Sequence, residues 1–333
     1  MPASTAHAAQ RCIDALSTAA HSSSSPLYTV LNMANTLELS RQAWVIRGQS
    51  RSRRVGGWPV WFARNTAEKP MLYLHSAASS AQLCALSDET AQRGILCNDI
   101  ENQPSAWPRG AQPSLPLWLA THPRCTPYDP ASGAEARAIV LAGLRTLYVE
   151  GKPGFYYLAL HDQDSAVTLD AQERDDALKG MYPIQRRQGQ VRLLGAGRAL
   201  VEVAEAAQLL EQDWNIRAQL WSCPSYTRLA REAAAAERWN RLHPTAPRHS
   251  CHLRECLGGS SAPVIAVTGY PQAIVDQLAA HVEARFVALG AGSVQASAPS
   301  RYWIVVCALR ALVDEGCMDA NQVEKAMDRY ALN

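Results

Sequence analysis

With 333 residues, 47% of them hydrophobic, the chain is long enough to bury two cores, and its length predicts two domains. Lysine and arginine number 32 against 30 aspartates and glutamates, so the net charge gives no support for a nucleic-acid or membrane partner. No apolar run approaches the ~20 residues of a membrane span, and the start of the chain lacks the apolar core of a secretion signal. We therefore expect a cytoplasmic protein.

Residues 1–26 are small and polar and end in "HSSSSP", which predicts a mobile tail or a loosely docked helix. A first domain is expected over 27–185. Up to about residue 120 its short apolar runs alternate with polar stretches, and the four prolines between 102 and 116 predict a loop. That loop is either disordered or a new binding surface.

The pattern sharpens from Asp129 onward. "ASGAEARAIVLAGLRTLYVEG" has apolar residues at helical spacing, and "FYYLAL" is typical of a buried strand. Over 186–333 strands such as "QVRLL", "IRAQLWSC" and "PVIAVTGY" alternate with helical stretches such as "ALVEVAEAAQLLEQDW" and "PQAIVDQLAAHVEA". This alternation predicts an α/β domain with a mainly parallel sheet and helices on both faces, and we expect the same class for the first domain.

Short motifs carry no chemistry by themselves. "LLGAGRAL" places glycines between a strand and a helix, but it lacks the third glycine of a dinucleotide fingerprint. The basic run at Arg47, Arg51, Arg53 and Arg54 indicates a solvated loop, because no glycine-rich turn adjoins it. The chain also lacks a lysine-containing phosphate loop, a nucleophile elbow and a metalloprotease histidine pair.

Nine cysteines at irregular spacing are typical of reduced thiols rather than of a disulfide framework. Cys251 and Cys256 have His249 and His252 beside them, which suggests zinc. The spacing is not that of a zinc finger or ribbon, and no second ligand pair follows. We therefore predict no metal site.

The second half of the chain carries a longer resemblance. The segments "RCTPYDP", "FYYLALHDQD", "ALKGMYPI", "GQVRLLGAGRALVEVAEAAQLLEQDW" and "ERWNRLHP" resemble the C-terminal part of the homodimeric decarboxylating component of the pyruvate dehydrogenase complex. That family consists of thiamine-diphosphate enzymes related to transketolase. The resemblance is dense from about 124 to 248 and thinner afterwards. It implies a degenerate pyrimidine-binding domain over 27–185 and a transketolase C-terminal-like domain over 186–333.

"ERWNRLHP", Glu237 to Pro244, is the most specific part of the resemblance. In the family this segment packs against neighbouring domains and the dimer partner. The resemblance therefore implies an interface at Arg238, Trp239, Asn240 and His243, with Trp239 as a buried anchor. A homodimer is the simplest association.

The catalytic residues of the family are largely missing. No Gly-Asp-Gly occurs in the chain, so it should hold no thiamine diphosphate or magnesium unless a partner chain supplies the diphosphate domain. Glu38 falls near the place of the glutamate that activates the cofactor's aminopyrimidine ring, and Pro59 near a family proline. His122 is the candidate remnant of a histidine-rich loop. The two candidate catalytic residues are thus Glu38 and His122.

Two functions remain open. The first is a truncated, non-catalytic relative that dimerises or binds a thiamine enzyme or a 2-oxoacid dehydrogenase complex. The second is the β-type half of a split thiamine-diphosphate enzyme that needs a partner chain. Retained core and interface segments beside missing site residues favour the first.

Overall fold

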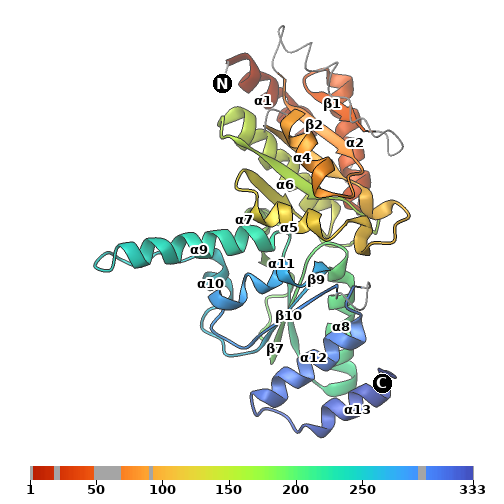
Figure 1. Cartoon of the computed structure of the whole chain (residues 1–333), viewed down its shortest axis with the longest axis vertical. Helices are drawn as coiled ribbons and strands as arrows, with labels where there is room; N and C mark the ends of the chain where they lie inside the picture. The colour runs from red at the N-terminus through yellow and green to blue at the C-terminus, as the bar shows by residue number, and fades with distance from the viewer. Residues whose placement is uncertain (1–2, 19–22, 49–68, 90–92, 292–297, 333) are drawn as a thin grey trace. The chain divides into compact units, whose positions relative to one another are not determined.

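The computed structural model describes residues 3–18, 23–48, 69–89, 93–291 and 298–332. Pro59 and the arginines at 51, 53 and 54 lie outside these ranges. The chain divides into two compact units, Met1–Arg174 and Asp175–Asn333 (Figure 1). The second unit thus begins about ten residues before the predicted boundary at 186. The reason is β6 (Tyr182–Pro183), which pairs antiparallel with a strand of the second sheet and ties this segment to it.

The first unit is built on a five-stranded parallel sheet with the order β1-β2-β3-β5-β4. Its strands are β1 (Trp44–Arg47), β2 (Met71–His75), β3 (Arg93–Asn98), β4 (Cys125–Tyr128) and β5 (Gly154–Ala159). Every residue of β2 and β5 is buried, as expected for strands covered on both faces.

Helices cover both faces of this sheet. α4 (Ser80–Glu89) and α5 (Ser114–Thr121) link strands that advance in one direction, whereas α6 (Gly133–Leu144) returns in the opposite direction from β4 to β5. Because such crossovers are right-handed, α6 lies on the other face. There it packs against α2 (Pro26–Ser40) and continues as the π-helical turn η3 (Arg145–Val149).

Of the two alternatives for residues 1–26, a mobile tail or a docked helix, the structure shows a helix over residues 3–18. Residues Ala3–Thr18 form α1, which packs against α2, α6 and η3. Cys12 and Leu16 are fully buried, and Ala9 and Ile13 lie on the same stripe. The small apolar residues at helical spacing are enough to dock this helix, although the segment as a whole is polar.

The proline-rich stretch 102–116 is more ordered than a plain loop. Short 3₁₀ turns, η1 (Ile100–Asn102) and η2 (Pro108–Gly110), lead into α5, which already contains Pro116. Proline is tolerated there because the first-turn N–H groups have no partner within the helix.

The second unit contains another five-stranded sheet, with the order β10-β9-β7-β8-β6. β7 (Val191–Gly195), β8 (Ala218–Ser222), β9 (Val264–Pro271) and β10 (Phe286–Ala291) are parallel, and only the edge strand β6 is antiparallel. The predicted α/β class, with two mainly parallel sheets flanked by helices, is therefore confirmed. Its helices are α7 (Ala171–Lys179, which crosses the boundary), α8 (Ala199–Trp214), α9 (Tyr226–Leu242), α10 (His252–Leu257), α11 (Ala273–Asp276), η4 (Ala279–His281), α12 (Arg301–Asp314) and α13 (Asn321–Arg329).

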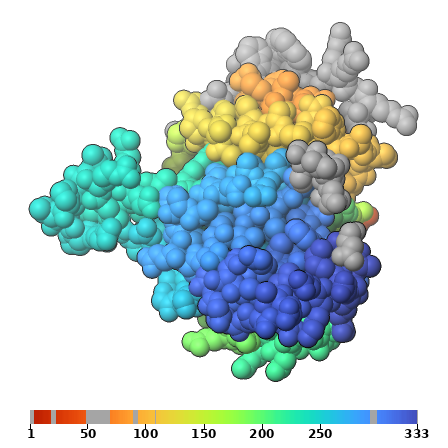
Figure 2. Space-filling view, turned by 60° about the horizontal axis from the view of Figure 1, so that its bottom comes forward, coloured from red at the N-terminus to blue at the C-terminus, as the bar shows by residue number. Residues whose placement is uncertain are grey.

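Two helical segments of this unit do not pack along their whole length against the sheet. The predicted helix over "PQAIVDQLAAHVEA" is only α11 followed by η4, and its buried apolar stripe ends at Leu278. All five buried residues of α9 lie between Tyr226 and Ala233, so the second half of α9 projects from the unit as an arm (Figures 1 and 2). None of the described helices is long and apolar enough to cross a membrane.

Candidate functional site

Polar side chains gather at the carboxyl edge of the first sheet. His75 ends β2, Asn98 ends β3, Asp129 follows β4, and His161 comes two residues after β5. Because parallel strands end at the same edge, these residues share one end of the sheet, where ligands of α/β proteins usually bind. We refer to these four residues, together with Glu101 and Arg109, as the polar edge.

Asn98 organises the backbone at this edge. Its side-chain oxygen accepts hydrogen bonds from the N–H groups of Ala77 (3.0 Å) and Ile100 (3.2 Å). Its side-chain nitrogen donates to the carbonyl of Ala77 (2.8 Å) and to the hydroxyl of Tyr157 (2.9 Å). Every polar atom of this buried amide is therefore satisfied by the protein, and Asn98 fixes the loop that follows β2.

His75 is buried beside Asn98, with 3% of its surface exposed. Its Nδ1 accepts a hydrogen bond from the N–H of Ala77 (3.3 Å), so the neutral ring carries its proton on Nε2. That Nε2 has no hydrogen-bond partner among the described residues. Burial lowers the pKa of His75 to about 3, so the ring stays neutral near pH 7 and can donate a hydrogen bond but cannot act as an acid.

The charged side chains at the polar edge are paired with one another. Arg109 binds Asp129 with two hydrogen bonds, of 2.6 and 2.7 Å, and also binds Glu101. The Arg109 and Glu101 side chains are 5% and 0% exposed. The φ angle of Arg109 is 53°, in the left-handed region that non-glycine residues rarely adopt. A bidentate ion pair thus holds a strained turn against the sheet rather than offering a charge to a ligand.

The two predicted catalytic residues do not lie together. Glu38, in the last turn of α2, is bound by Arg47 of β1 through hydrogen bonds of 3.0 and 3.1 Å. His122 caps the end of α5, just before β4 begins, so it lies at the amino edge of the sheet, opposite the polar edge. Its ring contacts Trp118 and Phe155, with centroids 4.5 and 5.3 Å away. The structure thus gives His122 an aromatic packing role, and α2 and α5 cover opposite faces.

Sequence reasoning overlooked His75 and Asn98, although a local signal was present. "MLYLH" and "RGILCN" each end an apolar run with a polar residue, which is what a strand leading into a site looks like. The signal is weak, because only the strand order shows that β2 and β3 are neighbours and that His75 and Asn98 therefore lie close together.

The predicted interface residues lie on the arm of the second unit. Trp239 is partly exposed and stacks between His243 (centroids 4.5 Å apart) and His249 (3.6 Å apart). Asn240 bonds both the N–H and the carbonyl of His249, at 2.7 and 2.9 Å. Arg238 is exposed. Within one chain Trp239 packs on His243 and His249 and stays partly exposed, so its burial at an interface with another chain remains a prediction.

Cys251, Cys256, His249 and His252, the residues whose pairing suggested zinc, do not form a metal site in the described part of the chain. Cys256 Sγ lies 3.5 Å from His252 Nε2, which also lies 2.8 Å from the Met181 carbonyl. Burial raises the pKa of the Cys256 thiol to about 12. In the described ranges, no three His, Cys, Asp or Glu side chains are placed to hold a metal ion.

Comparison with known proteins agrees with the α/β fold described above. Residues 180–302 match the family model for the transketolase-like C-terminal domain. These residues form a transketolase-like C-terminal domain. The chain resembles the pyruvate dehydrogenase E1 component of Cupriavidus necator, with 34% identity over 272 residues, 75% of this chain and 30% of that protein. The Pseudomonas aeruginosa E1 component is 34% identical over 235 residues, 65% of this chain and 26% of that protein.

The chain spans less than a third of the length of these relatives. Among solved structures, a split-gene transketolase described as an inactive β4 tetramer matches with a TM-score of 0.52 and 13% identity, over 87% of this chain and 98% of that one. Transketolase from Campylobacter jejuni also gives 0.52 and 13%, over 81% of this chain and 42% of that one. The transketolase-like fold therefore extends beyond the C-terminal domain, and the resemblance predicted from sequence is confirmed.

Proposed function

We propose that this chain works by binding rather than by turnover: it dimerises, or it engages a subunit of a 2-oxoacid dehydrogenase complex or another thiamine enzyme. The observation that carries the proposal is the polar edge of the first sheet. Its arginine is bound to two carboxylates, and its buried histidine His75 is neutral because burial lowers the pKa of the ring to about 3. A catalytic edge would instead keep an acid or base whose pKa is matched to the working pH.

The residues present also do not fit thiamine diphosphate. Activation of its aminopyrimidine ring needs a carboxylate that can face the cofactor, and the carboxylate of Glu38 is held by Arg47. Its diphosphate needs a magnesium ion with oxygen ligands, and the 333 residues contain no Gly-Asp-Gly sequence. We therefore derive no catalytic step through this cofactor.

The test is turnover of the purified chain with pyruvate, thiamine diphosphate, magnesium and an artificial electron acceptor. We expect the rate to equal that of the blank without protein. Thiamine diphosphate binding should be measured in parallel by calorimetry, since a chain that binds without turnover differs from one that does neither. Turnover by this chain alone would overturn the proposal.

The second candidate is a β-type enzyme half, which the match to nearly the full length of the split-gene transketolase chain favours. In that case a partner chain would bring the diphosphate domain and magnesium. Purification at native abundance, followed by mass spectrometry, distinguishes the two. A stoichiometric companion with a Gly-Asp-Gly motif supports the enzyme half, whereas a homodimer or a complete dehydrogenase complex supports binding.

If such a companion is found, Glu38→Gln tests the enzyme half directly. The reconstituted pair should lose its activity if Glu38 activates the cofactor, and an unchanged rate would reject that role. Glu150→Gln is a matched control, because Glu150 is also exposed and also pairs with a basic residue, Lys152, at 2.8 Å.

A further inference from the structure

The arm of α9 (residues 234–242) is attached to the rest of the second unit through one side chain. Every residue from 234 to 250 is exposed or half-buried, and full burial resumes at Cys251. Within the described part of the chain, the side-chain hydrogen bonds and ion pairs that leave this stretch all belong to Glu237. A helix end with so little buried surface opens locally more easily than the body of the unit. The partners of Glu237 therefore decide how firmly the arm is held.

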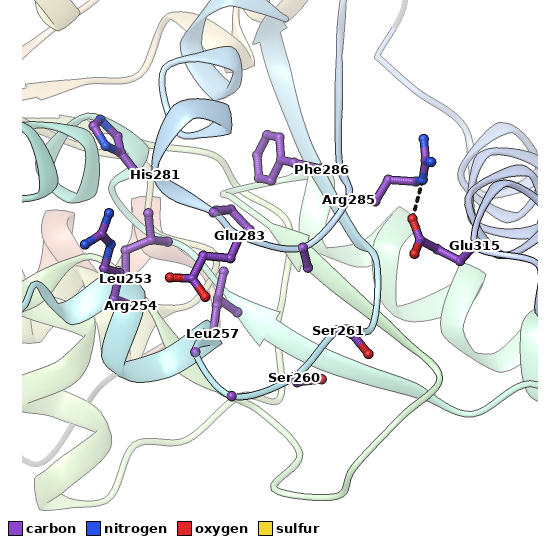
Figure 3. A pocket seen from close by; sticks show the side chains of 14 residues that line it. Leu253, Arg254, Leu257, Ser260, Ser261, His281, Glu283, Arg285, Phe286 and Glu315 are labelled. Atoms are coloured by element: carbon purple, nitrogen blue, oxygen red, sulfur yellow. Dashed lines mark hydrogen bonds and ion pairs between the residues drawn. The ribbon is translucent and has the colours of Figure 1, made fainter.

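Two side chains from neighbouring elements bind the Glu237 carboxylate. His281 of η4 places its Nδ1 2.8 Å from Oε1, and Arg254 of α10 places a guanidinium nitrogen 3.2 Å from the same oxygen. Figure 3 shows His281 and Arg254 on one side of a pocket, away from Arg285 and Glu315. The His281 side chain is 11% exposed, so water screens its bond to the carboxylate less than it screens a fully exposed pair.

The strength of this attachment depends on pH through one of the two partners. The hydrogen bond with His281 lowers the pKa of Glu237, and the nearby charges of Arg254 and Arg241 lower it further. The carboxylate and the guanidinium groups thus keep their charge between pH 5 and 8, whereas imidazole is the side-chain type that gains a proton in this range. The contact between Glu237 and His281 is then an ion pair at the low end of the range and a hydrogen bond from a neutral ring at the high end.

The surrounding charges act on the ring in both directions. Three carboxylates stand on the elements packed around the pair: Glu255 on α10, Asp276 on α11 and Glu283 two residues after His281. They favour the protonated ring, as the carboxylate of the arm does. Arg254 opposes it, because two cations then share one carboxylate. Since the guanidinium remains bound over the whole range, loss of the ring proton weakens the attachment of the arm but does not abolish it.

We propose that His281 and Glu237 form a pH-dependent latch on the arm. The protonated ring holds the arm closed, and loss of its proton as pH rises lets the arm open locally more often. The arm and the residue after it carry the predicted interface residues, Arg238, Trp239, Asn240 and His243. The latch therefore regulates the binding surface, a consequence that rests on the proposed function. The latch itself does not.

The test is amide exchange of the full chain between pH 5.5 and 8, corrected for the intrinsic pH dependence of exchange. Protection of the amides of residues 238–242 should fall about threefold as pH rises, because a charge-assisted bond becomes a neutral one. A change in global stability would act in the opposite sense, since the buried ring of His75 weakens the fold as pH falls. Amides of β7 and β9 serve as the internal reference.

Variants identify the group that titrates. His281→Gln keeps a hydrogen-bond donor without a titrating charge, so the pH dependence of protection should vanish. Arg254→Gln should lower protection at every pH and retain the dependence. His249→Gln is the matched control, because His249 stacks on Trp239 within this region and does not touch Glu237. It should retain the dependence as well. Protection that rises with pH, or a dependence that survives in His281→Gln, would overturn the latch.

Association is measured separately, by sedimentation of the same samples at pH 5.5 and 8. A dimer at either pH whose arm shows no pH-dependent protection rejects the latch and leaves the proposed function intact. A pH-dependent arm in a chain that binds neither itself nor a partner supports the latch and counts against the proposed function. Binding that changes with pH in the unaltered chain, but not in His281→Gln, supports both.

Discussion

The carboxylate of Glu38 and the guanidinium of Arg47 form two parallel hydrogen bonds, of 3.0 and 3.1 Å, and Arg47 also donates to the side-chain oxygen of Asn35 at 2.8 Å. Both charged side chains of the pair are 42% exposed. A carboxylate engaged in this way is a surface ion pair that joins α2 to β1.

Glu38→Gln should therefore have little effect on the isolated chain. An exposed ion pair contributes about 0–1 kcal/mol, so the free energy of unfolding in urea should change by no more than that. A loss of several kcal/mol would mean that the pair is more deeply coupled to the fold than its exposure indicates.

Arg109→Met should be strongly destabilising. It leaves Glu101, whose side chain is fully buried, and Asp129 without their common partner, at a cost of about 3–5 kcal/mol in the free energy of unfolding. Arg109→Lys should recover only part of this, because lysine cannot bind Asp129 through two parallel bonds. Arg145→Met, at an exposed site in the same unit, should change stability by less than about 0.5 kcal/mol.

His75 should make stability depend on pH. Because its pKa falls from 6.5 in the unfolded chain to about 3 in the fold, the unfolded state binds the proton first as pH drops. Stability should therefore be fully present above pH 6.5 and fall by up to about 1.4 kcal/mol per pH unit below it, until the folded pKa is reached.

The window between pH 6.5 and 4.5 isolates this effect. Glu202 and Glu237 have lowered pKa values because they are hydrogen-bonded to Arg301 and His281, so their contributions are lost only below about pH 4.5. Urea unfolding at pH 7, 6 and 5 measures the slope, and His75→Gln should flatten it. An unchanged slope in that variant would show that other groups carry the dependence.

Arg192→Met should loosen the loop over 257–262, whose carbonyls the buried Arg192 side chain of β7 binds. Three carbonyls would lose a buried charged donor, which should lower the free energy of unfolding by about 2–3 kcal/mol. Amide exchange over 257–262 should become faster than in the unaltered chain. Arg217→Met, at an exposed position beside β8, should leave that exchange unchanged.

Asn240→Ala should open the end of the arm without unfolding the unit. The variant loses both hydrogen bonds to the backbone of His249, and so the stacking of Trp239 on His249 should weaken. Tryptophan fluorescence and amide exchange over 243–250 report this change. The global unfolding midpoint should hold, because the buried residues of α9 end at Ala233. Asn240→Asp keeps the hydrogen-bond acceptor but not the donor. Its amide exchange over 243–250 should therefore lie between that of the unaltered chain and that of Asn240→Ala.

Much of the fold followed from local patterns. The apolar run "FYYLAL" and the helical stripe of "ALVEVAEAAQLLEQDW" predicted β5 and α8. A strand buried on both faces is apolar throughout, whereas a helix that covers a sheet is apolar along one stripe. The alternation of such elements was enough for the α/β class. For residues 3–18 the sequence left a tail and a docked helix both open, because a stripe of alanine and cysteine with one isoleucine and one leucine is a weak hydrophobic signal, and its packing is completed by α2, α6 and η3.

The sequence by itself determined the α/β class, the family resemblance and the absence of Gly-Asp-Gly, since each depends on residues close together along the chain. Only the tertiary structure decided that Arg47 holds Glu38, that His122 lies at the amino edge of the sheet, and that Arg109 binds both Glu101 and Asp129. Electrostatic roles depend on which charges meet in space, and this is set by strand order and loop path rather than by local spacing.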